Sequence, residues 1–212
     1  RAMVESVEGY DPARRSACHL PGGDARKVET RAVSLAGPVL TDIIATALKV
    51  GECNACMGRI VAAPTAGASG VLPAVLLPIR KKYDFSEEEM VKALYVSAGF
   101  GQVIATRASI AGAEGGCQAE IGSASAMAAA ALVSLLGGSP EQMAAACATA
   151  LQNLLGLVCD PVAGLVEVPC VKRNVIGAVN ALTAAELALA GVENVIPCVE
   201  VIDAMRAVGD VM

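Results

Sequence analysis

Aromatic side chains are nearly missing from this chain of 212 residues, which has three tyrosines, two phenylalanines and no tryptophan. The chain is still long enough to bury a substantial core, and hydrophobic residues make up 55% of it. That core must therefore be built from Ala, Val, Leu, Ile and Met. The 21 glycines allow backbones to approach one another closely, which favours tightly packed helices.

Positive charge is also scarce. The chain has 16 Lys and Arg against 21 Asp and Glu, which gives a net charge of -5 and a pI of about 5.0. A protein that binds nucleic acid through its phosphates needs an excess of positive charge. We therefore expect no nucleic-acid partner.

Two uncharged stretches, residues 60–79 and 121–140, have the length of a membrane span, and the mean hydropathy is +0.57. The first contains three prolines and the second is mostly Ala and Ser, so neither is typical of a lipid-exposed helix. No signal peptide is visible at the start. Eight cysteines without secretory signals indicate a reducing environment, so we expect a cytoplasmic protein that does not cross a membrane.

Residues 1–30 are polar and begin with Arg rather than Met, which suggests a segment of a longer polypeptide. Residues 31–212 form the expected helical domain. No stretch shows the sustained alternation of a strand. The sequence predicts an all-α fold, a compact bundle of Ala- and Gly-rich helices that are largely buried.

Helix boundaries are marked by capping residues. Ser86 with Glu89 has the pattern of a capping box, and Ser139 with Pro140 at the first helical position and Gln142 indicates another helix start. The expected helices start at Thr41 and end at Gly51, start at Ser86, run from Ser139 to about Leu155, cover residues 174–190, and follow Pro197.

Three loops rich in Gly and Pro lie between these helices, at residues 63–70, 111–125 and 156–170. Each stands where a helix begins, and the N-terminus of a helix offers free backbone N–H groups to anions. We expect these loops to carry the function.

Cysteines in two of these loops are candidates for metal ligands. Cys117, Cys159 and Cys170 are separated by 42 and 11 residues, so the fold must bring them together. Zinc sites and ferredoxin clusters usually show C-x-x-C pairs instead. Cys53 and Cys56 form such a pair, and on spacing alone they are the better metal or redox signal. They also fit two small core residues near a turn, and the residues alone leave both interpretations open.

Three long motifs change that weighting: "NACMGRIVAAPTAGASGVLPAVLLPI", "ASIAGAEGGCQAEIGSASAMAAAALV" and "NLLGLVCDPVAGLVEVPCVKRN". They resemble the alpha chain, or alpha domain, of the iron-sulfur L-serine dehydratases of bacteria. The resemblance covers the chain from about Gly22 to Gly209.

The resemblance implies that Cys117, Cys159 and Cys170 hold a 4Fe-4S cluster and that residues 31–212 are the catalytic domain. It also implies L-serine as substrate, pyruvate and ammonia as products, a separate beta chain or domain, and an oligomer. Three thiolates leave one iron open, and an open iron can act as a Lewis acid on the β-hydroxyl, a poor leaving group.

Other residues receive roles from their place in the motifs. Thr65, Gly67 and Ser69 could hold the substrate carboxylate with hydroxyls and backbone N–H groups. Lys172 and Arg173 could neutralise the cluster or bind carboxylate, although they also fit a solvated helix start. Further candidates are Ser123 and Ser125 as hydrogen-bonding groups near Cys117, and Glu114, Glu120, Asp160 and His19 as acid or base.

Two alternatives remain open. One is a related cluster lyase that acts on L-cysteine and expels sulfide. The other is a helical subunit without catalytic activity, in which the cysteines are inert.

Overall fold

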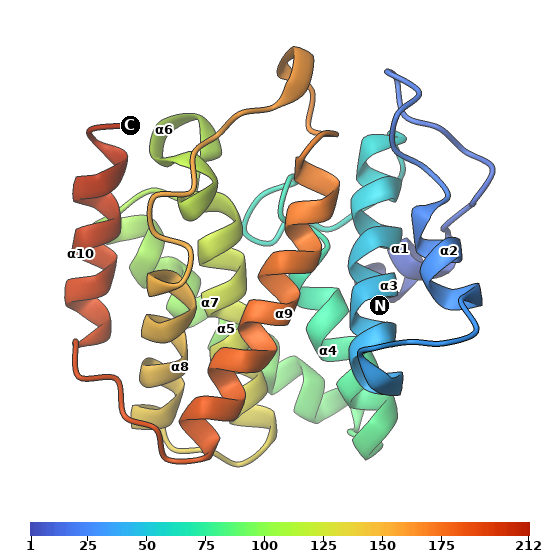
Figure 1. Cartoon of the computed structure of the whole chain (residues 1–212). Helices are drawn as coiled ribbons and strands as arrows, with labels where there is room; N and C mark the ends of the chain where they lie inside the picture. The colour runs from blue at the N-terminus through green and yellow to red at the C-terminus, as the bar shows by residue number, and fades with distance from the viewer. The chain divides into compact units, whose positions relative to one another are not determined.

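The computed structural model describes all 212 residues, and its regular elements are helices (Figure 1). This confirms the predicted all-α fold. The helices are α1 (Ala2–Glu8), α2 (Asp24–Thr30), α3 (Gly37–Ala55), α4 (Val71–Tyr83), α5 (Glu87–Arg107), α6 (Gly112–Cys117), the π-helical turn η1 (Gln118–Gly122), α7 (Ser123–Leu135), α8 (Pro140–Gln152), the 3-10 turn η2 (Val162–Gly164), α9 (Cys170–Leu189) and α10 (Cys198–Gly209). None of these helices has both the length and the apolar character needed to cross a membrane.

The chain divides into two units. Unit 1 comprises residues 1–83 and 160–179, and unit 2 comprises residues 84–159 and 180–212. The polar segment 1–30 forms α1 and α2 and belongs to unit 1. The division falls within α9, so this helix contributes its first half to unit 1 and its second half to unit 2.

Unit 1 is organised around α3, which contacts α1, α2 and α4 (Figure 1). The expected end of α3 at Gly51 is wrong, because the helix continues to Ala55. Gly51 is buried, and a Cβ atom there would lie 3.3 Å from the Cγ1 atom of Val171. This glycine therefore permits close packing of α9 against α3.

Unit 2 is organised around α7, which packs against α5 and α8. Its middle is a run of Ala with Met127, Leu132 and Val133, all buried, which explains how a core forms without aromatics. The predicted capping box is confirmed, since the Ser86 hydroxyl accepts from the Glu89 N–H. The helix start predicted at Ser139 is also confirmed, and there the Ser139 hydroxyl accepts from the Gln142 N–H.

Of three other helix boundaries, two differ from the prediction and one confirms it. α8 ends at Gln152, a few residues before the predicted end, and α9 begins at Cys170 rather than at residue 174. α10 follows Pro197 as predicted. The stretch 111–125 is largely helical, through α6, η1 and the start of α7, and is not the extended loop that its glycines suggested.

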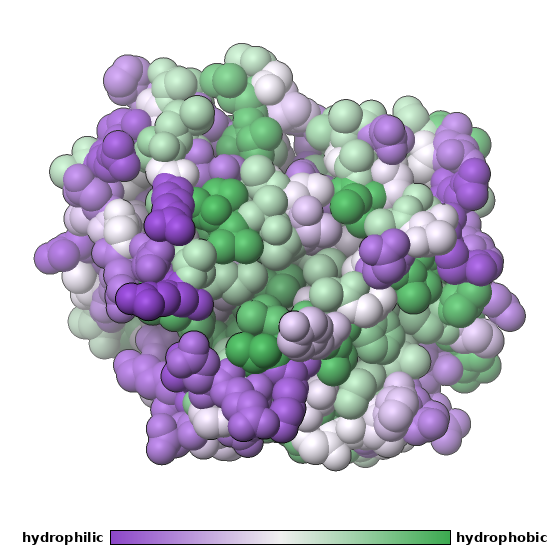
Figure 2. Space-filling view, turned by 180° about the vertical axis from the view of Figure 1, so that it is seen from behind, coloured by the Kyte–Doolittle hydropathy of each residue, from purple (hydrophilic) through white to green (hydrophobic).

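The surface carries apolar as well as charged groups. Figure 2, which shows the molecule from behind, has green apolar areas between purple hydrophilic ones. The exposed apolar side chains of α5 include Val91, Tyr95 and Val103. The high mean hydropathy therefore reflects exposed apolar residues as well as a large core.

Candidate functional site

A buried asparagine fixes the loop 63–70 in unit 1. Asn174, on α9, is 1% exposed. Its Oδ1 accepts from the Gly70 N–H at 2.8 Å, and its Nδ2 donates to the Gly67 carbonyl at 2.7 Å and to the Cys170 carbonyl at 3.0 Å. One amide thus joins the Thr65–Ser69 loop to the helical turn that begins with Cys170.

The hydroxyl of Ser69 lies in this loop without a hydrogen-bond partner. The residue is 1% exposed, and its Oγ makes no bond to protein. A buried hydroxyl that lacks a partner is costly and calls for an explanation, such as a bound ligand. Thr65, in the same loop, is partly exposed.

The segment before Cys170 is tied to the one that holds Cys18 and His19. The carboxylate of Glu167 is buried and accepts a hydrogen bond from the Cys18 thiol, and the Glu167 carbonyl accepts from the Val171 N–H at 3.0 Å. His19 is exposed, with a φ of 60°. The histidine therefore follows directly on a residue anchored beside the start of α9.

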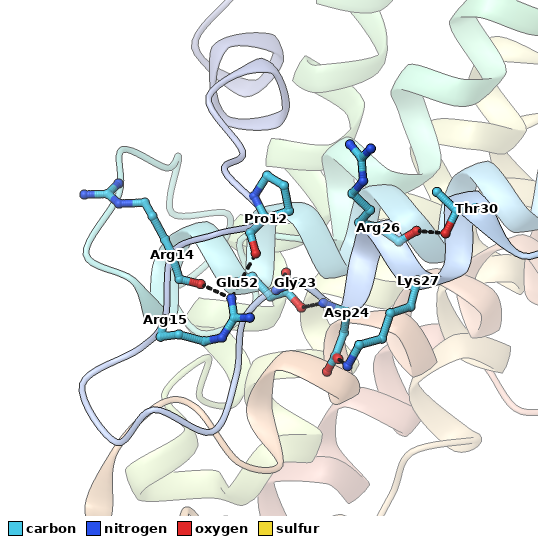
Figure 3. Close-up of polar contacts among 9 residues, drawn as sticks. All are labelled: Pro12, Arg14, Arg15, Gly23, Asp24, Arg26, Lys27, Thr30 and Glu52. Carbon is cyan, nitrogen blue, oxygen red and sulfur yellow. Dashed lines mark hydrogen bonds and ion pairs between the residues drawn. The ribbon is translucent and has the colours of Figure 1, made fainter.

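A second buried carboxylate fixes the other end of that segment, as Figure 3 shows. Glu52, on α3, is 1% exposed and accepts from the backbone N–H groups of Gly23 at 3.0 Å and Asp24 at 2.8 Å. These are the first N–H groups of α2, where a negative charge is favourable. Burial and the neighbouring Glu52 charge raise the pKa of Tyr10.

The two basic residues after Cys170, Lys172 and Arg173, lie in different surroundings. Arg173 Nη1 lies 2.5 Å from Asp160 Oδ1, and the arginine side chain is 11% exposed. Lys172 is exposed to solvent. The structure thus engages Arg173 with Asp160, the residue after Cys159, and leaves the Lys172 side chain at the surface.

In unit 2, Cys117 follows a turn that only glycine adopts easily. Gly116 has a φ of 75° and a ψ of 179°. A Cβ atom there would come within 2.7 Å of the Leu157 carbonyl oxygen and 3.5 Å of the Val158 Cα. The segment that holds Cys117, which is 2% exposed, therefore lies against the segment just before Cys159.

Gln118 completes that arrangement. Its backbone N–H donates to the Leu157 carbonyl at 2.9 Å, its side-chain oxygen accepts from the Gly156 N–H at 2.9 Å, and its Nε2 donates to the Met205 carbonyl at 2.9 Å. It also begins the π-helical turn η1, a distortion often found at functional sites. One residue thus connects Cys117, the loop that leads to Cys159, and α10.

The two serines of this region differ. Ser123 is fully buried and its hydroxyl has no partner. Ser125 accepts from Asn180 Nδ2 at 2.9 Å, and the same Nδ2 donates to the Ala150 carbonyl. Ser125 is therefore part of the packing of α7, α8 and α9, whereas the Ser123 hydroxyl is left for another partner.

None of the eight cysteines forms a disulfide. Cys117 and Cys159 belong to unit 2 and Cys170 to unit 1, and no three His, Cys, Asp or Glu side chains form a group that could hold a metal ion. Burial raises the pKa of both the Cys53 and the Cys56 thiols.

A polar cavity of about 410 Å³ in unit 2 is bordered by α5, α6 and α10. It is lined by Glu114, Ser109 and Arg206, among others, and the Ser109 hydroxyl donates to Glu114 at 2.8 Å. Glu120 is half-buried and lies in η1. Of the carboxylates proposed as acid or base, Glu114 therefore faces a cavity and Asp160 faces an arginine.

Sequence reasoning missed three residues that position the site: Asn174, Gln118 and Glu52. The two amides stand inside the quoted motifs, directly after Cys117 and one turn after Cys170. Glu52 is a charged residue in a largely apolar helical run that also contains Lys49. Such a charge is almost never fully buried unless it is paired.

Comparison with known proteins gives a family. The profile of the family described as "Serine dehydratase alpha chain" matches residues 1–212. The chain is 55% identical over 214 residues to "Probable L-serine dehydratase, alpha chain" of Bacillus subtilis, which covers 100% of this chain and 70% of that protein.

Two further relatives show how the match is distributed. "L-serine dehydratase, alpha chain" of Peptoniphilus asaccharolyticus is 54% identical over 179 residues, which are 84% of this chain and 61% of that one. "L-serine dehydratase" of Streptomyces coelicolor is 44% identical over 183 residues, 81% of this chain but 40% of that protein. The region equivalent to this chain is thus one part of a longer polypeptide in the Streptomyces relative.

Proposed function

Because the chain belongs to the serine dehydratase alpha chain family, a family of enzymes, we propose that it is the catalytic part of an L-serine ammonia-lyase that yields pyruvate and ammonia. The observation that carries the proposal is the family match over the whole chain. Two relatives are named as alpha chains, and in a third the equivalent region is part of a longer protein. We therefore include a beta chain or domain as the partner, and L-serine as the substrate.

The proposed cofactor is a 4Fe-4S cluster held by Cys117, Cys159 and Cys170. Three observations support this fit: none of the three cysteines is in a disulfide, Gly116 and Gln118 place the Cys117 segment against the one before Cys159, and Asn174 ties Cys170 to a polar loop. When bound, a cluster with three thiolate ligands supplies an open iron as a Lewis acid for the serine hydroxyl.

The loop 63–70 then binds the substrate. The Ser69 hydroxyl is buried without a partner and can donate to a carboxylate, and Thr65 adds a second hydroxyl. Asn174 holds the loop backbone on both sides of Ser69 through Gly67 and Gly70. Because these bonds are made without substrate, the loop is already ordered when serine arrives, which lowers the entropic cost of binding.

Charge and proton transfer fall to other groups. Arg173 is paired with Asp160 at 2.5 Å, and Asp160 directly follows Cys159, so its proposed role is to offset the charge of this carboxylate beside the thiolates. Lys172 is exposed and is assigned the weaker role of attracting the carboxylate from solvent. Removal of the α-proton needs a base, for which Glu114, Glu120, Asp160 and His19 are the candidates.

The test is a side-by-side rate measurement with L-serine and L-cysteine. The chain is loaded anaerobically with iron and sulfide and assayed alone and with its beta chain. We expect little turnover by the chain alone, and pyruvate from L-serine once the beta chain is added. Faster release of sulfide from L-cysteine would instead identify a cysteine lyase. Absence of turnover with both substrates, together with failure to bind iron, would identify a helical subunit.

A further inference from the structure

Two cysteines outside the proposed cluster site lie side by side in unit 2. Cys147 is in the middle of α8 and is fully buried, whereas Cys198 is the first residue of α10 and is partly exposed. The two thiols are hydrogen-bonded to each other. α8 and α10 pack against each other, as Figure 1 also shows.

The segment that leads into α10 is fastened to α8 just beyond Cys147. Asn194 Nδ2 donates to the Thr149 hydroxyl at 3.1 Å and to the Gln152 Oε1 at 2.7 Å. Its Oδ1 accepts from the Ile196 N–H at 3.1 Å. These bonds, independent of the cysteines, hold Cys198 beside Cys147.

The two thiols are chemically unequal. The Cys147 thiol donates a hydrogen bond to Cys198. This bond and, after it, burial raise the pKa of Cys147, whereas the same bond lowers the pKa of Cys198 against the opposing effect of burial. Cys198 also stands at a helix N-terminus, where a negative charge is favoured. The partly exposed thiol is therefore the better nucleophile, and the buried one is placed to react second.

We propose that Cys147 and Cys198 are a redox-responsive pair, a modification site that closes to a disulfide on reaction with a peroxide. The Cys198 thiolate attacks one oxygen of hydrogen peroxide, the O–O bond breaks, and the departing hydroxide takes up a proton to give water. Cys147 then attacks the Cys198 sulfenic acid, the S–S bond forms, and a second water leaves. Two thiols are oxidised by two electrons, and one peroxide is reduced to two waters.

The link would act on the helix that supports Gln118. The Met205 carbonyl of α10 accepts from the Gln118 side chain. Gly209 of α10 lies against Gly115, since a Cβ atom on Gly209 would lie 3.1 Å from the Gly115 Cα. A disulfide at the first turn of α10 fixes this helix covalently to α8. The oxidised chain should therefore unfold at a higher temperature than the reduced chain.

The test maps the disulfide directly. The full chain, with and without loaded iron and sulfide, is treated anaerobically with one equivalent of hydrogen peroxide and quenched with N-ethylmaleimide. Cleavage after Glu places Cys198 in residues 194–200, and Cys147 with Cys159 in residues 142–167. We expect these two peptides to be joined in most molecules, and the intact chain, weighed in a sample without N-ethylmaleimide, to be lighter by two hydrogens, about 2 Da.

Variants then assign the partner. Cys147→Ala, which suits an Ala-rich run, should abolish the link and leave a sulfenic acid at Cys198 that dimedone traps several-fold more than in the wild type. Cys198→Ser should abolish both products, and the control Cys56→Ala should keep the link. A link that persists in Cys147→Ala, or a main disulfide between other cysteines in the wild type, would overturn the proposal.

Discussion

In each unit, one buried side-chain amide holds the segment next to a proposed ligand cysteine, but the two amides differ in the groups that they bond. In unit 1, the three bonds of the Asn174 side chain all go to backbone groups of the 67–70 turn and of its own helix. In unit 2, the Gln118 side chain bonds Gly156 and Met205, which belong to a loop and to another helix. Asn174 shapes one loop, whereas Gln118 joins separate segments.

This difference suggests separate duties for the two amides. Asn174 serves the loop proposed to bind serine, next to Cys170. Gln118 serves the placement of the loop before Cys159 relative to Cys117. Changes at Asn174 should therefore alter substrate binding most, and changes at Gln118 should alter iron retention most.

The largest effect is expected at the proposed ligands, in both units alike. Replacement of Cys117, Cys159 or Cys170 by Ala should reduce bound iron to the background level, because two thiolates hold a cluster poorly. Cys18, Cys53, Cys56 and Cys198 variants should retain wild-type iron content after anaerobic reconstitution. Equal loss in Cys53→Ala and Cys117→Ala would show that the ligands are assigned wrongly.

Asn174→Ala should have the next largest effect. It leaves a buried N–H and two carbonyls without their partner, which should lower the free energy of unfolding by about 3 kcal/mol. Urea denaturation measures this. Asn153→Ala is a suitable control, because the Asn153 side chain is exposed and donates a hydrogen bond to Asn180 Oδ1 at 2.7 Å, so its cost should stay below about 1 kcal/mol.

Gln118→Leu should cost less, about 2 kcal/mol, because the buried Met205 carbonyl and the N–H of the exposed Gly156 lose their partner. Its second effect should be a looser loop before Cys159, seen as faster amide hydrogen exchange at residues 156–159 and as less iron after reconstitution. Gln118→Glu keeps the acceptor for the Gly156 N–H, so its stability and its iron content should lie between those of the wild type and those of Gln118→Leu. Unchanged exchange in Gln118→Leu would refute the positioning role.

The smallest effect on stability is expected at the two serines without partners. Ser69→Ala and Ser123→Ala remove an unsatisfied buried hydroxyl, so each protein should be as stable as the wild type or more stable, by up to about 1 kcal/mol. If Ser69 binds the carboxylate, its loss should still raise the KM for L-serine about tenfold, which corresponds to about 1.4 kcal/mol. A KM that does not change would remove Ser69 from the site.

Local signals carried most of what the sequence predicted about the fold. The capping box at Ser86, the helix start at Ser139 and the start of α10 after Pro197 depend on neighbouring residues, and all three are confirmed. The predicted helix end at Gly51 is wrong because this glycine allows a close contact with Val171, which is distant in the sequence. The helical nature of 111–125 was missed because its glycines suggest a loop, while the structure uses one of them, Gly116, for a single turn.

For the candidate site too, local sequence signals supplied some residues, whereas others depend on contacts between distant segments. The motifs supplied the candidate cysteines and the loop at Thr65 and Ser69, and these assignments stay predictions. The residues that position them were not predicted, because the partners of Asn174 in the 67–70 turn are more than a hundred residues away in the chain. A buried amide is recognised only when its partners are known.

The most direct measurement follows the paramagnetic resonance signal of the iron-loaded protein in air, with and without L-serine. An iron that the protein leaves open to substrate is also open to oxygen, and its loss should produce the signal of an oxidised three-iron cluster as activity falls. L-Serine should slow this change, and L-alanine, which lacks the hydroxyl, should protect less. Absence of bound iron, or equal stability in air and under argon, would contradict the proposed cluster and its role in serine deamination.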